Sequence, residues 1–178
     1  MSRSLRLTTA AAWLATALAV PTAVALQQTV DINKITEAGV GEKIGTVTIT
    51  DGPSGVSFKV AVSNLPAGSH GFHVHEKGDC GPGKKDGKMQ AGIAAGEHFD
   101  PGHTKTHKGP KGQGHKGDLP ALKADAKGKI NATVTAPRLK GEEIRGRSLV
   151  IHEGGDTYSD QPESGGGKGR IACGVIPG

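Results

Sequence analysis

Residues 45–62 read GTVTITDGPSGVSFKVAV, and this stretch decides the fold because it has the pattern of a β-hairpin. Its first arm, residues 45–50, is rich in Thr, Val and Ile, and its second arm, residues 56–62, alternates apolar and polar side chains. Residues 51–55 between them are Asp, Gly, Pro, Ser and Gly, which favour a turn. Because a period of two is typical of a strand with one buried face, we predict two antiparallel strands here.

Five further segments have the length and composition of strands: residues 29–35, 71–76, 129–135, 148–152 and 170–176. After residue 25, no stretch of ten or more residues repeats its apolar side chains with the 3.6-residue period of a helix. Short strands separated by Gly- and Pro-rich segments predict one all-β domain, either a sandwich or a Greek-key barrel.

Two long glycine-rich stretches, residues 77–122 and 153–169, do not fit the strand pattern. Loops of this length are uncommon in compact domains and are usually functional. We therefore expect both stretches to carry parts of a functional site.

The first 25 residues have the layout of a secretory signal peptide. Arg3 and Arg6 precede an apolar stretch, residues 9–20, and Ala23-Val24-Ala25 forms a small-x-small cleavage site. Cleavage after Ala25 would leave residues 26–178 as one exported domain, in the periplasm or secreted. The apolar stretch is short for a bilayer span and no second candidate follows, so we expect no membrane association after cleavage. An uncleaved membrane anchor is the alternative.

Export bears on how the cysteines and the basic charge are interpreted. Cys80 and Cys173 are the two cysteines, and in an exported chain a disulfide between them is the natural expectation, with two buried thiols as the alternative. The formal net charge is +5, and lysines concentrate in residues 84–88 and 105–116. With so few aromatic side chains we expect no nucleic-acid binding. The lysines form either a solvated face or a surface that attracts an anionic substrate.

Two histidines, His73 and His75, lie two residues apart in the predicted strand 71–76. Side chains at i and i+2 of a strand lie on the same face, so these two imidazoles suit a copper or zinc ion. A half-exposed strand that carries two polar residues by chance is the alternative.

The first long loop carries four more histidines, at positions 98, 103, 107 and 115, followed by Asp118. His107, His115 and Asp118 offer two nitrogens and one oxygen, and His98 could supply a third nitrogen to complete a tetrahedral zinc site. A solvated polar loop with incidental histidines is the alternative.

Three blocks of sequence resemble the copper–zinc superoxide dismutases. They are residues 71–80, residues 98–101 with 118–120, and residues 151–156 with 169–176. The cysteine directly after Gly78-Asp79, and the run of residues 156–162, resemble the exported bacterial branch. This resemblance implies an eight-stranded Greek-key β-barrel or sandwich, immunoglobulin-like in form, with two long functional loops.

The resemblance also implies a role for each matched residue. Copper would be held by His73, His75, His98 and His152. Zinc would be held by His98, His107, His115 and Asp118, so His98 would bridge the two metals. Asp156 would hydrogen-bond one histidine from each side, Arg170 would line the substrate channel, and Cys80 would pair with Cys173.

The implied activity is the conversion of two superoxide anions into dioxygen and hydrogen peroxide. Copper would cycle between Cu(II) and Cu(I), His98 would take up a proton, and zinc would be structural, with one ion of each metal per subunit. The alternatives are a non-catalytic copper- and zinc-binding or copper-delivery protein on the same fold, and a structural or adhesion-type β-sandwich with incidental histidines. The subunit is expected to be a monomer or a homodimer.

Two histidines match no ligand position. His103 lies between matched ligands, and His70 stands at an odd spacing from His73, which would turn it to the opposite face of the strand. We predict that both lie at the surface.

Overall fold

The computed structural model describes residues 27–178, and the predicted signal peptide, residues 1–25, lies outside the described residues. This part of the chain contains strands and three short 3₁₀ helices, and no α-helix occurs in it. The strands are β1 (Gln27–Thr36), β2 (Gly39–Gly52), β3 (Gly55–Val62), β4 (Gly68–His70), β5 (Phe72–His75), β6 (Gly83–Lys85), β7 (Lys88–Gln90), β8 (Leu122–Ala124), β9 (Ile130–Ala136), β10 (Ser148–His152) and β11 (Arg170–Val175). The 3₁₀ helices are η1 (Ile93–Ala95), η2 (Gly141–Ile144) and η3 (Glu163–Gly166).

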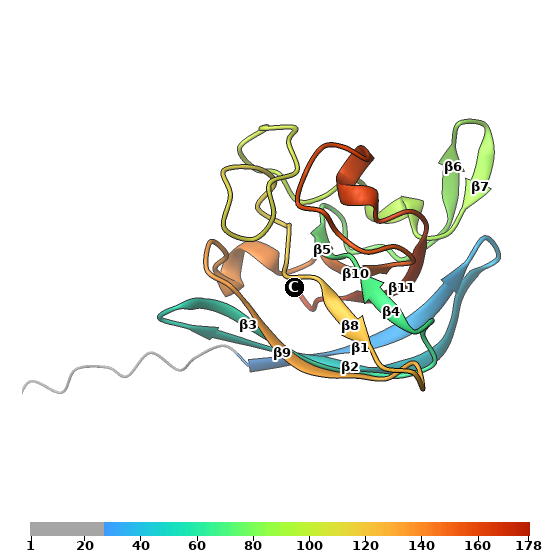
Figure 1. The fold of residues 1–178 in the computed structure, drawn as a ribbon, viewed down its shortest axis with the longest axis horizontal. Coiled ribbons are helices and arrows are strands. Elements are labelled where there is room, and N and C mark those ends of the chain that lie inside the picture. The colour runs from blue at the N-terminus through green and yellow to red at the C-terminus, as the bar shows by residue number, and fades with distance from the viewer. Residues whose placement is uncertain (1–26) are drawn as a thin grey trace, which may run out of the picture.

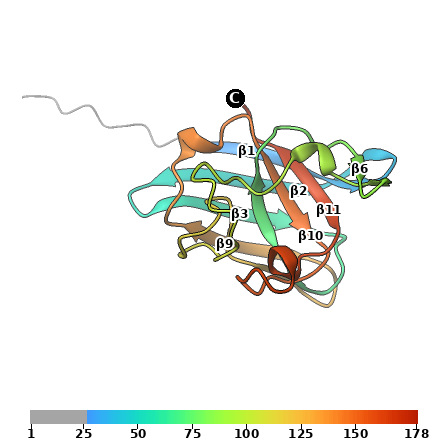
Figure 2. The same cartoon turned by 90° about the horizontal axis from the view of Figure 1, so that it is seen from above.

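Seven strands form one antiparallel sheet in the order β5-β10-β11-β1-β2-β3-β9. The sheet curls, so that β5 and β10 lie above the layer that contains β2, β3 and β9 (Figure 1). Seen from above, β10 and β11 run at an angle to β2, β3 and β9 (Figure 2). Because β1 pairs with both β2 and β11, the first and last strands of the described chain are neighbours.

The all-β prediction is confirmed, and each of the seven predicted strands is a member of this sheet. The structure adds two small antiparallel pairs, β4 with β8 and β6 with β7. Each of these four strands has three residues, which is too short for an alternating pattern to identify. The β6–β7 hairpin lies inside the predicted long loop 77–122.

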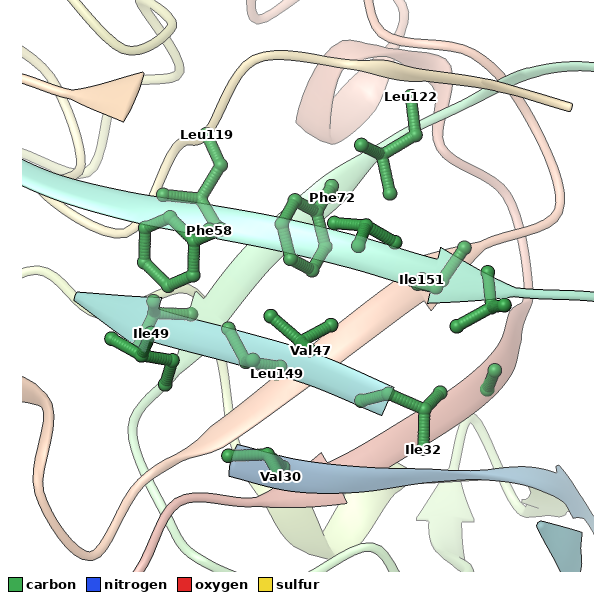
Figure 3. Close-up of a cluster of buried hydrophobic side chains, with 14 of the residues drawn as sticks. Val30, Ile32, Val47, Ile49, Phe58, Phe72, Leu119, Leu122, Leu149 and Ile151 are labelled. Carbon is green, nitrogen blue, oxygen red and sulfur yellow. The ribbon is translucent and has the colours of Figure 1, made fainter. Parts of the chain in front are cut away.

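The hydrophobic core fills the space between the two layers of the curled sheet (Figure 3). Strand β3 shows the predicted alternation, because Val56, Phe58, Val60 and Val62 are buried. The ring of Phe58 meets that of Phe72 from β5 edge to face, with centroids 5.8 Å apart.

Strand β5 is buried on both faces, and one of these faces carries residues of the candidate site. Phe72 and Val74 face the core, while His73 and His75 point the other way and are also fully buried. The long loops β7–β8 and β10–β11 lie over this side of the sheet (Figure 1). They cover the two histidines and bring the remaining candidate residues to them.

A disulfide joins Cys80 to Cys173, with their Cα atoms 5.7 Å apart. It lies in a small apolar cluster with Ile35, Ala95 and Val150. The first long loop is thereby attached to β11. Among residues 27–178, no helix has the length and apolar character needed to cross a membrane.

Candidate metal centre

Two adjacent strands place three of the predicted residues side by side. In the pairing of β5 with β10, His73 lies opposite Val150 and His75 opposite Ser148. His152 follows at the end of β10, where its backbone N–H donates to the Gly71 carbonyl over 2.9 Å. The histidines at 73, 75 and 152 are therefore fixed by sheet register.

The loop residues reach the same place by pairing with β5. His98 forms an isolated bridge with His75, and Asp118 forms one with His73. Three backbone bonds secure this contact: Val74 N–H to Gly117 O, Phe99 N–H to Val74 O and Gly117 N–H to Phe99 O, all of 2.8–2.9 Å. The loop thus continues the sheet beside β5.

The first donor group consists of His73, His75, His98 and His152, whose ligand atoms lie within 4.8 Å of one another. His75 Nδ1 donates to the Gly96 carbonyl over 2.9 Å, which leaves Nε2 with a lone pair. This Nε2 is 3.4 Å from His152 Nε2. Two unprotonated nitrogens at this distance repel each other unless a proton or a cation lies between them.

The second donor group is centred on one carboxylate oxygen. Asp118 Oδ1 lies 3.0 Å from His107 Nδ1, 3.2 Å from His98 Nδ1 and 3.4 Å from His115 Nδ1. His73, His98, His107 and Asp118 also have ligand atoms within 4.8 Å of one another. His115 stands at the rim of this group, with 16% of its side chain exposed. His98 belongs to both donor groups, and His73 also has a ligand atom within 4.8 Å of both.

Asp156 connects the two donor groups by hydrogen bonds to one histidine of each. Its Oδ2 accepts a hydrogen bond from His73 Nε2 and its Oδ1 accepts one from His107 Nε2, both of 2.7 Å. These bonds place a proton on Nε2 of each ring, so that Nδ1 is the ligand atom of His73 and, once it has lost its own proton, of His107. A Cβ on Gly165 would lie 2.4 Å from Asp156 Oδ1, and its φ of +74° is also unfavourable for other residues.

Burial and hydrogen bonding divide the histidines into two electrostatic classes. Desolvation lowers the pKa of His152 to about 3 and holds the pKa values of His73 and His75 well below the usual range. Burial opposes protonation of His107 as well, but hydrogen bonds to Asp118 and Asp156 outweigh it and raise its pKa to about 9. At neutral pH the imidazoles of the first donor group are therefore uncharged, which is the form that binds metals.

A cleft of about 760 Å³ opens onto the first donor group. His98, His152 and Arg170 line it, and Lys85 and Lys168 also contribute to its wall. Arg170 is half-buried and donates to the Gly92 carbonyl over 2.6 Å. Although burial lowers its pKa, a guanidinium remains protonated at neutral pH. The cleft therefore presents a fixed positive charge beside His152.

One sequence prediction near the site is wrong. His70 is not at the surface but 1% exposed, with Nδ1 2.7 Å from the His152 carbonyl and Nε2 2.8 Å from the Pro66 carbonyl. The prediction failed because His70 belongs to β4 and His73 to β5, so one alternating strand does not connect them. His103 is exposed, as predicted.

Two further contacts at the site were not predicted. The Gly96 carbonyl orients His75, and Asp160 Oδ1 accepts a hydrogen bond from the His107 backbone N–H over 2.6 Å. Asp160 lies in the run of residues 156–162 that supports the family resemblance. The contact of the Gly96 carbonyl cannot be predicted from the sequence, because every residue has a backbone carbonyl.

Comparison with known proteins shows to which family the chain belongs. Residues 43–176, which include every candidate site residue, match the family described as copper/zinc superoxide dismutase (SODC). The chain belongs to the copper/zinc superoxide dismutase family.

Members of this family from bacteria are similar over most of the chain. The copper–zinc superoxide dismutase of Brucella abortus is 54% identical over 150 residues, which is 83% of this chain and 87% of that protein. The structure of the Brucella abortus enzyme superimposes with a TM-score of 0.83 at 53% identity, covering 85% of this chain and 99% of the other. The solution structure of the monomeric Salmonella enterica enzyme gives 0.75 at 49% identity, covering 85% and 99%.

The two donor groups suit the metals after which the copper/zinc superoxide dismutase family is named. The buried Nδ1 atom of His73 has no hydrogen-bond partner among the described residues, and the buried Nδ1 atoms of His107 and His115 both approach a single carboxylate oxygen, Asp118 Oδ1, which cannot satisfy them with good geometry. Burying an unpaired ring nitrogen is unfavourable, and coordination of a cation would remove that cost. Four imidazoles suit copper, and imidazoles with one carboxylate suit zinc.

The lowered histidine pKa values predict how this superoxide dismutase family member responds to acid without metal. Between pH 6.5 and about 3, the unfolded chain protonates His152 but the folded chain does not. The free energy of unfolding of the metal-free protein should therefore fall as the pH drops through this range, by up to about 1.4 kcal/mol per pH unit for this residue. Urea unfolding at pH 4, 5, 6 and 7 measures the slope.

His152→Gln provides the comparison for this measurement. The folded variant has no acid-sensitive group at this position, so its stability should depend less steeply on pH. Equal slopes for the two proteins would contradict the prediction.

Proposed function

We propose that this protein is a superoxide dismutase that converts two superoxide anions and two protons into dioxygen and hydrogen peroxide. The observation that carries the proposal is a pair of donor groups that share His98 and open into a cleft with a fixed cation. The family membership and the similarity of about half the residues to bacterial copper–zinc superoxide dismutases support the same activity. A copper-delivery protein is not favoured, because every donor position and Arg170 are present.

The proposed ligand sets follow from the convergence of the donors. Copper is assigned to His73, His75, His98 and His152. Zinc is assigned to His98, His107, His115 and Asp118. For the second set the support is the approach of three Nδ1 atoms to Asp118 Oδ1. Asp156 orients His73 and His107 by its two hydrogen bonds.

Copper, when bound, supplies the one-electron exchange, because zinc does not change its oxidation state. The remaining tasks belong to the residues of the chain. His98 Nδ1 faces Asp118, so Nε2 is the nitrogen that can hold a proton on the copper side and give it to the peroxide product. Arg170 pairs with the superoxide anion, and Lys168 adds a second positive charge to a cleft wall that also carries Glu37, Glu97, Glu153 and Glu163.

The activity is tested with the purified protein loaded with copper and zinc. It should accelerate the decay of superoxide, removal of copper by a chelator should abolish the acceleration, and adding copper back should restore it. No acceleration by a protein with full copper and zinc content would refute the proposal.

Arg170→Ala should slow superoxide consumption about tenfold or more and weaken its dependence on ionic strength. The physical reason is that a cation at the mouth of a cleft raises the association rate of a small anion by one to three orders of magnitude at low salt. Stopped-flow decay of superoxide at several salt concentrations measures both effects.

Arg170→Lys retains a positive charge in the cleft and should keep much of the ionic-strength dependence. Arg145→Ala, which removes an exposed arginine outside the cleft, is the matched control and should change neither quantity. The role assigned to Arg170 is wrong if Arg170→Ala instead loses copper or zinc.

We further propose that residues 1–25 are a cleaved signal peptide and that residues 26–178 form the mature enzyme in the periplasm. The disulfide supports an oxidising compartment. The mass of the exported protein tests the cleavage site. All donor and cleft residues come from one chain, so the site is complete in a monomer and equally in each subunit of a homodimer; the native mass distinguishes these.

A further inference from the structure

Arg138 contacts a loop that is distant from it in the sequence. It lies two residues after the end of β9 and is half-buried. Its guanidinium donates to the carbonyls of Gly112, Gly114 (2.7 Å) and His115 (3.3 Å). Through these bonds one side chain of the barrel holds a segment of the loop formed by residues 106–118, which we call the zinc loop.

The zinc loop has little else to fix the segment that Arg138 holds. Apart from Pro110, all its residues are glycine, polar or charged, so apolar burial cannot offset the conformational entropy of ordering it. Within the loop, backbone bonds join His115 N–H to Thr106 O (2.8 Å) and Gly112 N–H to Gly109 O (3.3 Å). In the described structure, no backbone N–H of a loop or turn donates to the three carbonyls that Arg138 holds.

The position of this segment matters because it carries His115. Of the three histidines near Asp118 Oδ1, His115 is the most exposed and the most distant, at 3.4 Å. His98 is held beside β5 and His107 by Asp156 and Asp160. For His115, the corresponding contact is the hydrogen bond that its backbone carbonyl accepts from Arg138.

A second contact joins the same two parts of the molecule. Lys116, the residue after His115, forms an ion pair with Glu143 of η2. Glu143 also accepts a hydrogen bond from the Lys140 backbone N–H over 3.0 Å. The segment from Arg138 to η2 therefore contacts the zinc loop at residues before His115 in the sequence and at the residue after it.

We propose that Arg138 is a positioning residue that holds the zinc loop in its metal-binding conformation before zinc arrives. The inference rests on the zinc ligands assigned under the proposed function. A planar guanidinium can donate to three carbonyls at once, and neither an amide nor a lysine ammonium reproduces that arrangement. Without Arg138, the conformational entropy lost on ordering the zinc loop would weaken zinc binding, because the loop would become ordered only when zinc binds. His73, His75 and His152 would stay fixed by the strands.

The test compares zinc and copper affinity in the full mature protein. Metal-free wild type, Arg138→Gln, Arg138→Lys and Arg145→Gln are titrated with each metal in competition with a chromophoric chelator. Arg138→Gln should weaken zinc binding roughly tenfold, the lower end of the effect of losing an outer contact of a metal ligand. Copper affinity should not change. Arg138→Lys should recover part of the loss, and Arg145→Gln, which replaces an exposed arginine directly after η2, should match wild type.

Two readouts distinguish positioning from a general loss of stability. Cobalt(II) bound in the zinc site should show an altered visible spectrum in Arg138→Gln. In the metal-free variant, hydrogen exchange should accelerate at the amides of residues 112–116 and stay unchanged in β3 and β9. Should Arg138→Gln fail to fold, Arg138→Lys carries the same comparison.

Three results would overturn the inference: equal zinc affinity in Arg138→Gln and wild type, equal weakening of both metals, or accelerated exchange throughout the sheet. A wild-type protein that binds no zinc would instead refute the ligand assignment itself. The two failures are therefore distinguishable in one set of titrations.

Discussion

His152→Ala should reduce superoxide dismutation to the level of the metal-free protein. Its Nε2 lies 3.4 Å from that of His75, and both are buried, so no neighbouring side chain can replace it. Loss of an outer contact alone costs 10–100-fold in metal affinity, so loss of this proposed ligand should weaken copper binding by about 100-fold or more. Copper content after dialysis and the rate of superoxide decay measure the two effects.

His103→Ala is the matched control for this experiment. His103 is an exposed histidine of the first long loop, and it is absent from both donor groups. Its removal should leave copper content and activity unchanged. If His152→Ala kept both its copper and its activity, the copper assignment would be wrong; if it lost zinc but kept copper, the two donor groups would have to be reassigned.

Most of the fold could be predicted from the sequence because alternation is a local property. Strand β3 presents buried Val and Phe at every second position, and the turn before it contains Gly and Pro. The pairs β4–β8 and β6–β7 escaped prediction because three residues hold too little of an alternating pattern. Strand order also depends on long-range pairing, such as that of β1 with β11, which no local pattern contains.

The candidate site was predictable where its residues lie close together in sequence. His73 and His75 reveal themselves by their spacing, and the zinc loop by its concentration of histidines. His152 and Arg170 stand alone in their strands, and only the family resemblance pointed to them. The buried position of His70 and the bonds made by Arg138 could not be found in this way, since their partners are backbone carbonyls.

Replacing both Cys80 and Cys173 with alanine should lower the free energy of unfolding of the metal-free protein by about 4–5 kcal/mol. The disulfide closes a loop of 93 residues, and the chain-entropy model assigns this value to loops of that size. The bond also attaches the loop that carries His98 to β11, so more of the loop should open in the variant. Urea unfolding of the metal-free protein is the measurement, because bound metal would add its own stabilisation.

Alanine is the suitable replacement because the two cysteines are buried in an apolar cluster with Ile35, Ala95 and Val150, where a serine hydroxyl would lack a partner. The matched control is the wild-type protein after chemical reduction, which removes the bond but keeps both sulfur atoms. The alanine variant and the reduced wild type should show similar decreases in the free energy of unfolding. The difference between the two decreases measures the contribution of sulfur packing. A loss below about 1 kcal/mol in both would show that the disulfide does not constrain the unfolded chain as the entropy model requires, and the order of the loop around His98 would then have to come from its contacts with β5 alone.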